Sequence, residues 1–179
     1  MSGHNKWSKV KHKKTASDAQ KSKIFSKHAA VIAMESRKAS GNLASPGLAA
    51  AIERAKRDSM PKENIERAVA KGSGAGGASF QELVFEAFGP GGVGMIITAV
   101  TDNSNRTSQE IKHVLARLSY NLGTPGSAAW AFSKTAEGYV PINTLELSEE
   151  DGNKLAELIE VLHEQDDVQD VYTTADTSA

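Results

Sequence analysis

The fold is decided by residues 83–101, which read LVFEAFGPGGVGMIITAVT. Leu83 to Phe88 predicts a β-strand, and Gly94 to Thr101 predicts a second strand that is apolar enough to be central in a sheet. Gly89-Pro90-Gly91-Gly92 between them is typical of a turn. The glycines match the pattern G-x-G-x-x-G, but a dinucleotide site needs a helix after that pattern, and here a strand follows. The pattern therefore indicates a hairpin.

Helices and further strands follow this hairpin. Amphipathic helices are predicted after a capping box at Thr107 and Glu110, and after a cap formed by Ser148 with Asp151. The remaining strands are predicted at Ala128–Phe132, Tyr139–Ile142 and Val168–Thr173. This order favours an α+β fold, in which a ferredoxin-like antiparallel sheet carries two helices on one face.

The N-terminal part has a different period. A helical pattern begins at Thr15, a second helix is expected from Ser45-Pro46, and a third from Met60-Pro61 with Gly72 as its C-cap. Residues 73–79 are rich in glycine and read as a linker. We therefore expect a three-helix domain over residues 1–72, a linker over 73–79 and an α+β domain over 80–175.

The two predicted domains carry opposite charge. Residues 1–72 hold 16 lysines and arginines against six acids, whereas the rest of the chain holds 5 basic and 16 acidic residues. The net charge of -1 therefore hides a domain of +10 and a domain of -11. Such an asymmetry indicates that the basic domain binds a polyanion, or that the two domains attract each other.

Several function classes are disfavoured by the sequence. There is no cysteine, and the five histidines show no zinc-site spacing, so no metal, cofactor or thiolate nucleophile is predicted. His28 lies on the apolar stripe of a helix and is interpreted as a core or interface residue. No catalytic set or small-molecule substrate is indicated, and we expect a protein that is not an enzyme. No apolar run approaches a membrane span, and a cytoplasmic location is expected.

The strongest candidate site is the basic N-terminus. Its lysines surround one tryptophan, whose indole is suited to stacking on a nucleobase, while lysines contact phosphates without reading sequence. Arg106 is added to the site, because a cation at a helix N-terminus opposes the helix dipole and needs a partner such as Asp102 or a ligand. The predicted nucleic-acid-binding residues are Lys6, Trp7, Lys9, Lys11, Lys13, Lys14, Lys21, Lys23, Lys27 and Arg106.

Several motifs along the chain resemble those of the YebC family, which includes the mitochondrial translational activator of cytochrome c oxidase. Phe85-Glu86-Ala87-Phe88-Gly89-Pro90-Gly91-Gly92 looks like the family's Tyr-Glu-Gly-Tyr-Gly-Pro-Gly-Gly. The other similar segments are Gly3 to Trp7 with Lys11 to Lys14, Asp102 to Thr107, Asn121 to Gly123 through Gly126-Ser127, and Asp166 to Tyr172.

The resemblance implies an N-terminal helical domain followed by α/β domains, and a cytoplasmic, non-enzymatic regulator of gene expression. This sequence departs from the family after Trp130 to Lys134, where other members continue into an inserted third domain. Here the chain passes through Thr135 to Val140 directly towards the last helix. Phe85 and Phe88 also replace tyrosines, so roles that need those hydroxyls do not carry over.

Three functions remain open. The first is a translation-associated factor that contacts RNA or the ribosome through the basic domain. The second is a DNA-binding transcriptional regulator, which is weakened because the second and third helices carry few side chains suited to reading base edges. The third is a protein-interaction adaptor that works through the acidic domain.

Overall fold

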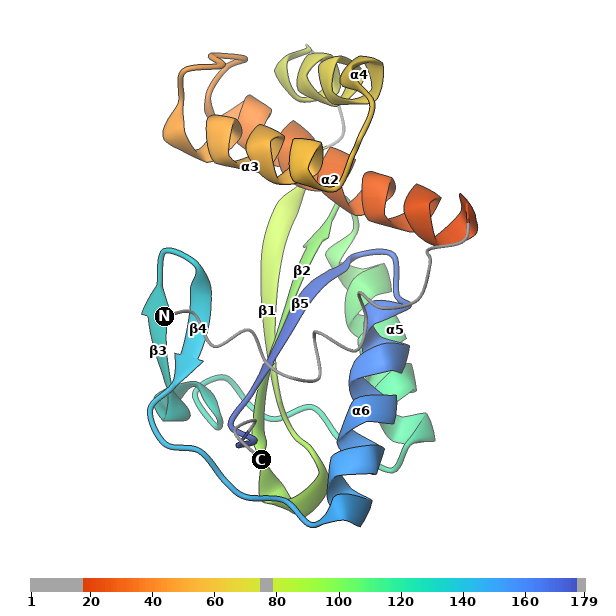
Figure 1. The fold of residues 1–179 in the computed structure, drawn as a ribbon, viewed down its shortest axis with the longest axis vertical. Helices are drawn as coiled ribbons and strands as arrows, with labels where there is room; N and C mark the ends of the chain where they lie inside the picture. Colours follow the sequence, from red (N-terminus) through yellow and green to blue (C-terminus); the bar gives the residue numbers. More distant parts are fainter. Residues whose placement is uncertain (1–17, 75–78, 177–179) are drawn as a thin grey trace. The chain divides into compact units, whose positions relative to one another are not determined.

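A computed structural model describes residues 18–74 and 79–176 (Figure 1). Within these residues the chain forms two compact units: a helical unit, residues 18–74 and 79–83 with 100–104, and a sheet unit, residues 84–99 with 105–176. The predicted α+β class, with helices first and an antiparallel sheet with helices after them, is confirmed.

The helical unit is built on α2 (Asp18–Lys38), α3 (Pro46–Arg57) and α4 (Lys62–Ser73). Pro46 occupies the start of α3, where its missing N–H is not needed by the helix. His28 of α2 lies 2.6 Å from Asp58 at the end of α3, so it is an interface residue, as expected. The core of this unit is small and contains Ile32, Leu48, Ala51, Ala55, Met60, Ile65 and Ala68.

The sequence predicted Gly72 as the C-cap of α4, and this prediction is wrong. Gly72 is a buried residue inside the helix, and Gly74 follows as the C-cap. A Cβ on Gly72 would overlap the carbonyl of Ala33 and approach the Cβ of Ser36 to 2.7 Å. Ser36 also donates a hydrogen bond of 2.7 Å to the carbonyl of Val69. Gly72 is therefore the point of close approach between α2 and α4.

The sheet unit contains most of β1 (Gln81–Phe88) and β2 (Gly94–Thr101), and all of β5 (Val168–Thr173), in the order β1-β2-β5. The predicted turn between β1 and β2 is confirmed as a short 3₁₀ segment, η1 (Pro90–Gly92), in which Gly91 has a φ of 65°. β2 and β5 pair antiparallel, with Ile97 opposite Val171. The buried β2 is the central strand, as expected.

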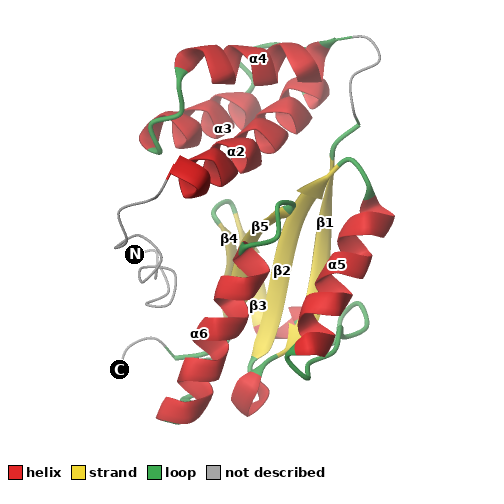
Figure 2. Cartoon of the chain, turned by 90° about the vertical axis from the view of Figure 1, so that its right-hand side faces the viewer, coloured by secondary structure: helices red, strands yellow, loops and turns green. Residues whose placement is uncertain are grey.

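Two helices cover one face of this sheet: α5 (Ser104–Arg117) and α6 (Glu149–His163) (Figure 2). Ser148 accepts a hydrogen bond from the Asp151 N–H, so the predicted cap of α6 is confirmed. The predicted capping box at Thr107 is wrong, because α5 already begins at Ser104. The core under the helices includes Val93, Met95, Ile97, Ile111, Leu115, Leu155, Leu158, Leu162 and Val168.

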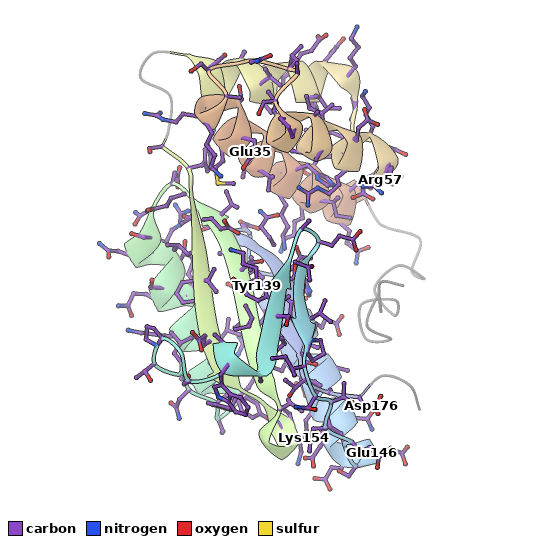
Figure 3. The ribbon with its side chains drawn as sticks, turned by 90° about the vertical axis from the view of Figure 1, so that its left-hand side faces the viewer. Glu35, Arg57, Tyr139, Glu146, Lys154 and Asp176 are labelled. Atoms are coloured by element: carbon purple, nitrogen blue, oxygen red, sulfur yellow. The ribbon has the colours of Figure 1, made fainter. Side chains whose placement is uncertain are left out.

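A separate hairpin of β3 (Phe132–Thr135) and β4 (Gly138–Pro141) packs against Tyr172 of β5. Tyr139 of β4 is labelled in Figure 3. The centroid of its ring lies 5.4 Å from the centroid of the Tyr172 ring. Tyr172 follows the helix-facing Val171, so it points to the other face of the sheet. The strand predicted at Ala128–Phe132 is wrong in its position: Ala129–Ala131 forms the 3₁₀ segment η2, and the strand begins at Phe132.

Among the described residues, no helix combines the length and the apolar character that crossing a bilayer requires.

Candidate nucleic-acid interface

The predicted binding residues fall in three places. Lys6, Trp7, Lys9, Lys11, Lys13 and Lys14 lie outside the described residues. Lys21, Lys23 and Lys27 lie on α2, in the helical unit. Arg106 lies on α5, in the sheet unit.

The three lysines of α2 do not share one face. Successive residues are rotated by about 100° around an α-helix, so Lys23 and Lys27 lie only about 40° apart. By the same rotation Lys21 points about 160° away from Lys23. Lys21 alone faces a groove between α2 and α4.

The α2–α4 groove has an apolar floor and a polar rim. Phe25 and Ala29 of α2, Met60, and Ala68 of α4 supply its apolar lining. Ser22, Ser26 and Asn64 supply hydroxyl and amide groups. Its charged lining residues are Lys21, Arg67, Lys71 and Asp18, and the open volume is about 530 Å³.

Two cations of this groove are available to a ligand. Among the described residues, neither Lys21 nor Arg67 has an acidic partner within ion-pair distance, and both are exposed. Lys71 lies over the Phe80 ring, with its Nζ 5.0 Å from the ring centroid. With three cations and one carboxylate in its lining, the groove favours an anion.

A second groove lies on the other side of α4, against α3, and it uses its charges differently. Its lining includes the apolar Leu43, Ile52, Ile65 and Val69. Its two lysines are neutralised by neighbours on their own helices: Lys56 lies 2.8 Å from Glu53, and Lys62 lies 3.6 Å from Glu66. The Lys56 hydrogen bond and charge hold the pKa of Glu53 below its usual range. This α3–α4 groove therefore offers little net attraction to an anion.

In the sheet unit, Arg106 is held by a carboxylate far away in the sequence. Its guanidinium donates a hydrogen bond of 2.9 Å to Asp167, whose side chain is only 15% exposed. The same carboxylate oxygen accepts a hydrogen bond of 2.6 Å from Thr107. Asp167 is therefore a structural partner of α5. The expected role of Arg106 at nucleic acid stays a prediction.

Glu86 of β1 organises the loop that precedes the β3–β4 hairpin. Its carboxylate accepts hydrogen bonds from the N–H groups of Gly126, Ala128 and Ala129, at 2.6, 2.7 and 2.8 Å. Burial alone would raise the pKa of Glu86, but these three backbone hydrogen bonds outweigh it and lower the pKa. The loop ends at Trp130, which is 73% exposed and donates its indole N–H to the Ser127 carbonyl.

Sequence reasoning missed the α4 side of the α2–α4 groove. Asn64, Arg67 and Lys71 recur at i, i+3 and i+7, which places them on one face of a helix and was a readable signal. Phe25 was not noticed, because it was one of several apolar residues of α2. Over residues 18–74 and 79–176, no cluster of His, Asp or Glu side chains is suited to a metal ion.

The fold defines a class of α+β protein in which a small three-helix unit accompanies an antiparallel sheet that is covered by two helices. The family profile for the TACO1/YebC protein N-terminal domain matches residues 5–75, and the profile for the TACO1/YebC second and third domain matches residues 80–137. The chain belongs to the TACO1/YebC family.

Relatives of similar sequence include two bacterial proteins. A "Probable transcriptional regulatory protein" of Thermotoga maritima is 35% identical over 235 residues, covering 97% of this chain and 93% of the relative. A protein of the same name from Desulfatibacillum aliphaticivorans is 38% identical over 192 residues, covering 99% and 77%. These names describe regulatory proteins.

A solved relative has the same fold. The crystal structure of a conserved hypothetical protein from Aquifex aeolicus matches with a TM-score of 0.83 and 30% identity, covering 93% of this chain and 95% of that chain.

The comparisons also show a difference in length. The alignment with the Thermotoga maritima relative spans 235 positions, whereas 97% of this chain is about 174 residues, so about 60 positions belong to the relative alone. The profile for the second and third domain stops at residue 137, in the turn between β3 and β4.

Proposed function

We propose that this protein is a nucleic-acid-binding regulator of gene expression that contacts RNA, on the ribosome, through its basic helical unit. One observation carries the proposal: Lys21 and Arg67 line the α2–α4 groove without an acidic partner among the described residues. The predicted lysines Lys6 to Lys14 precede α2 in the sequence and extend the same positive charge. Polyanions are the ligands that such a surface attracts.

The choice of RNA rests on what the helices offer to bases. Proteins that read duplex DNA place a helix in the major groove with Asn, Gln and Arg side chains at the base edges. Of these three residue types, α3 contains only Arg54 and Arg57, and α4 contains only Asn64 and Arg67. A surface with few side chains for reading base edges in a duplex groove suits structured RNA, which proteins bind by shape, phosphates and unpaired bases.

A DNA-binding transcriptional regulator is the second candidate, and the names of the relatives favour it. The experiment that separates the two is sedimentation of the tagged full chain from cell extract through sucrose, followed by filter binding to ribosomal RNA and to duplex DNA at equal salt. We expect the chain in the ribosomal fractions, released by ribonuclease and not by deoxyribonuclease. Recovery with DNA alone would contradict the RNA proposal.

The control is a variant with Lys11, Lys13 and Lys14 changed to Glu. Reversing three charges should remove retention of either nucleic acid on the filter while the helical circular dichroism is kept. Unchanged retention at low salt would contradict binding by the basic N-terminal region.

A further inference from the structure

We propose that the α2–α4 groove holds an unpaired nucleotide of an RNA strand, with the base against Phe25 and a backbone phosphate against Arg67 and Lys21. The inference rests on the proposed function and adds the form of the ligand: a single-stranded position in place of a duplex.

The apolar floor argues for a base in the groove. A duplex presents mainly phosphates and sugars to a flat basic surface, because its bases are stacked on one another. Against such a ligand the floor of Phe25, Ala29 and Met60 would have nothing to bind. An unpaired base offers a planar apolar face, and Phe25 packs on the core of the unit while remaining partly exposed.

The rim argues for a nucleotide over an apolar ligand. Ser22 and Ser26 each bring a hydroxyl, and Asn64 brings an amide with both donors and an acceptor. These groups are able to pair with the edge of any base, so the site tolerates different sequences. Arg67 and Lys21 add charge without an acidic partner among the described residues, as a phosphate requires.

The position of the groove in the chain argues for a strand over a free nucleotide. α2 carries Lys21 and Phe25 in its first turns and directly follows the basic region that contains Lys11, Lys13 and Lys14. The lysines of the basic region and the cations of the groove together match several phosphates of one strand. A mononucleotide carries too few phosphates to contact them all.

The test compares a 12-nucleotide RNA without self-complementarity and the same RNA paired with its complement, by fluorescence anisotropy with the full chain at fixed salt. Stacking of one base corresponds to a preference of about fivefold or more for the unpaired RNA. Phe25→Leu should abolish this preference, and Phe25→Tyr, which keeps the ring, should retain it. Leu43→Ala in the α3–α4 groove is the matched control and should leave the preference unchanged.

The outcomes separate the two proposals. If neither RNA binds the parent chain, the proposed function fails. If both bind and Trp7→Ala removes the preference while Phe25→Leu does not, the function stands and the groove assignment is overturned. The groove assignment is also overturned if a mononucleotide competes as well as the 12-mer at the same molar concentration.

If Phe25→Leu fails to fold by circular dichroism, Arg67→Gln decides. Loss of one phosphate contact should make the negative slope of log affinity against log salt shallower by about 0.7 on unpaired RNA. An unchanged slope overturns the assignment.

Discussion

In the helical unit, Lys21 and Arg67 face a groove and have no acidic partner among the described residues, whereas in the sheet unit Arg106 is bound to Asp167 and Glu86 holds three backbone N–H groups. The first pair of charges adds nothing visible to the fold, and the second set ties distant segments together. The difference teaches that net charge does not locate a binding surface, because a charge that is satisfied internally attracts a ligand weakly. The four variants below test the frame of the groove and this division of charges.

The largest effect is expected from Gly72→Ala, which tests whether α2 and α4 form a fixed frame for the groove. The added methyl group would overlap the Ala33 carbonyl, a backbone atom that cannot turn away. We expect a loss of about 3 kcal/mol in unfolding free energy, near the upper end for overpacking. Urea denaturation measures it, and the exposed neighbour Ser73→Ala is the control, with a change below about 0.5 kcal/mol. Equal stability of both variants would contradict the close approach.

The double variant Lys21→Gln/Arg67→Gln should weaken RNA binding and leave stability unchanged. Two lost phosphate contacts reduce the affinity by about 25-fold at 0.1 M salt and make the negative slope of log affinity against log salt shallower by about 1.4. Filter binding across a salt series measures both quantities.

The matched control for this double variant is Lys56→Gln/Lys62→Gln, which removes the same charge from the α3–α4 groove. Because these lysines already pair with Glu53 and Glu66, we expect a smaller loss. If both double variants lost the same affinity for RNA, the two grooves would not differ in their attraction for it.

Glu86→Gln should destabilise the sheet unit and leave RNA binding unchanged. Replacing a carboxylate that accepts three N–H bonds is expected to cost about 1 to 2 kcal/mol at pH 7. Because the pKa of Glu86 is lowered in the folded chain, its contribution is full above the unfolded pKa, about 4.3, and is lost as the pH falls through the folded pKa.

The pH series for Glu86 is read from urea midpoints of the parent and the variant. The difference between them should shrink as the pH falls below about 4. A difference that persisted in acid would show that the ionised carboxylate is not its source.

The smallest effect is expected from Arg106→Gln. The ion pair with Asp167 is partly exposed, and its loss should cost about 0.5 kcal/mol, with Thr107 still bound to Asp167. Affinity for RNA should stay within a factor of about two of the parent if the charge is satisfied internally, since a lost phosphate contact costs several-fold. If Arg106→Gln lowered the affinity for RNA as much as the loss of Lys21 or Arg67, Arg106 would count as part of the binding surface. Lys112→Gln, an exposed position of α5, is the control.

The sequence predicted those features that depend on neighbouring residues. The turn at Gly89 to Gly92, the central strand β2 and the cap of α6 at Ser148 are set by local pattern, and they were placed correctly. Gly72 was misread, because a glycine near a helix end is usually a cap and its contact with Ala33 comes from a separate part of α2. The strand at Ala128 was misplaced, because Glu86, more than 40 residues earlier, fixes that loop.

The candidate site was less predictable for the same reason. Asp167 lies 61 residues from Arg106, so no spacing rule connects them. Phe25 and Arg67 come to one groove only when α2 and α4 pack together, which no single helical pattern reveals. The lysines are visible in the sequence. Which of them have an acidic partner becomes clear only in the folded structure.

The turn of the β3–β4 hairpin is a place where the fold can accept an inserted segment. Thr135 and Gly138 pair across the ladder, so only Ala136 and Glu137 form the turn, and the profile of the second and third domain ends there. A segment inserted at that turn would leave and re-enter the fold at neighbouring points, and loop closure grows only slowly more costly with length. The contact between Tyr139 and Tyr172 would keep the hairpin packed on β5 below such an insertion. A segment inserted at this turn would therefore leave the pairing of β3 with β4 in place.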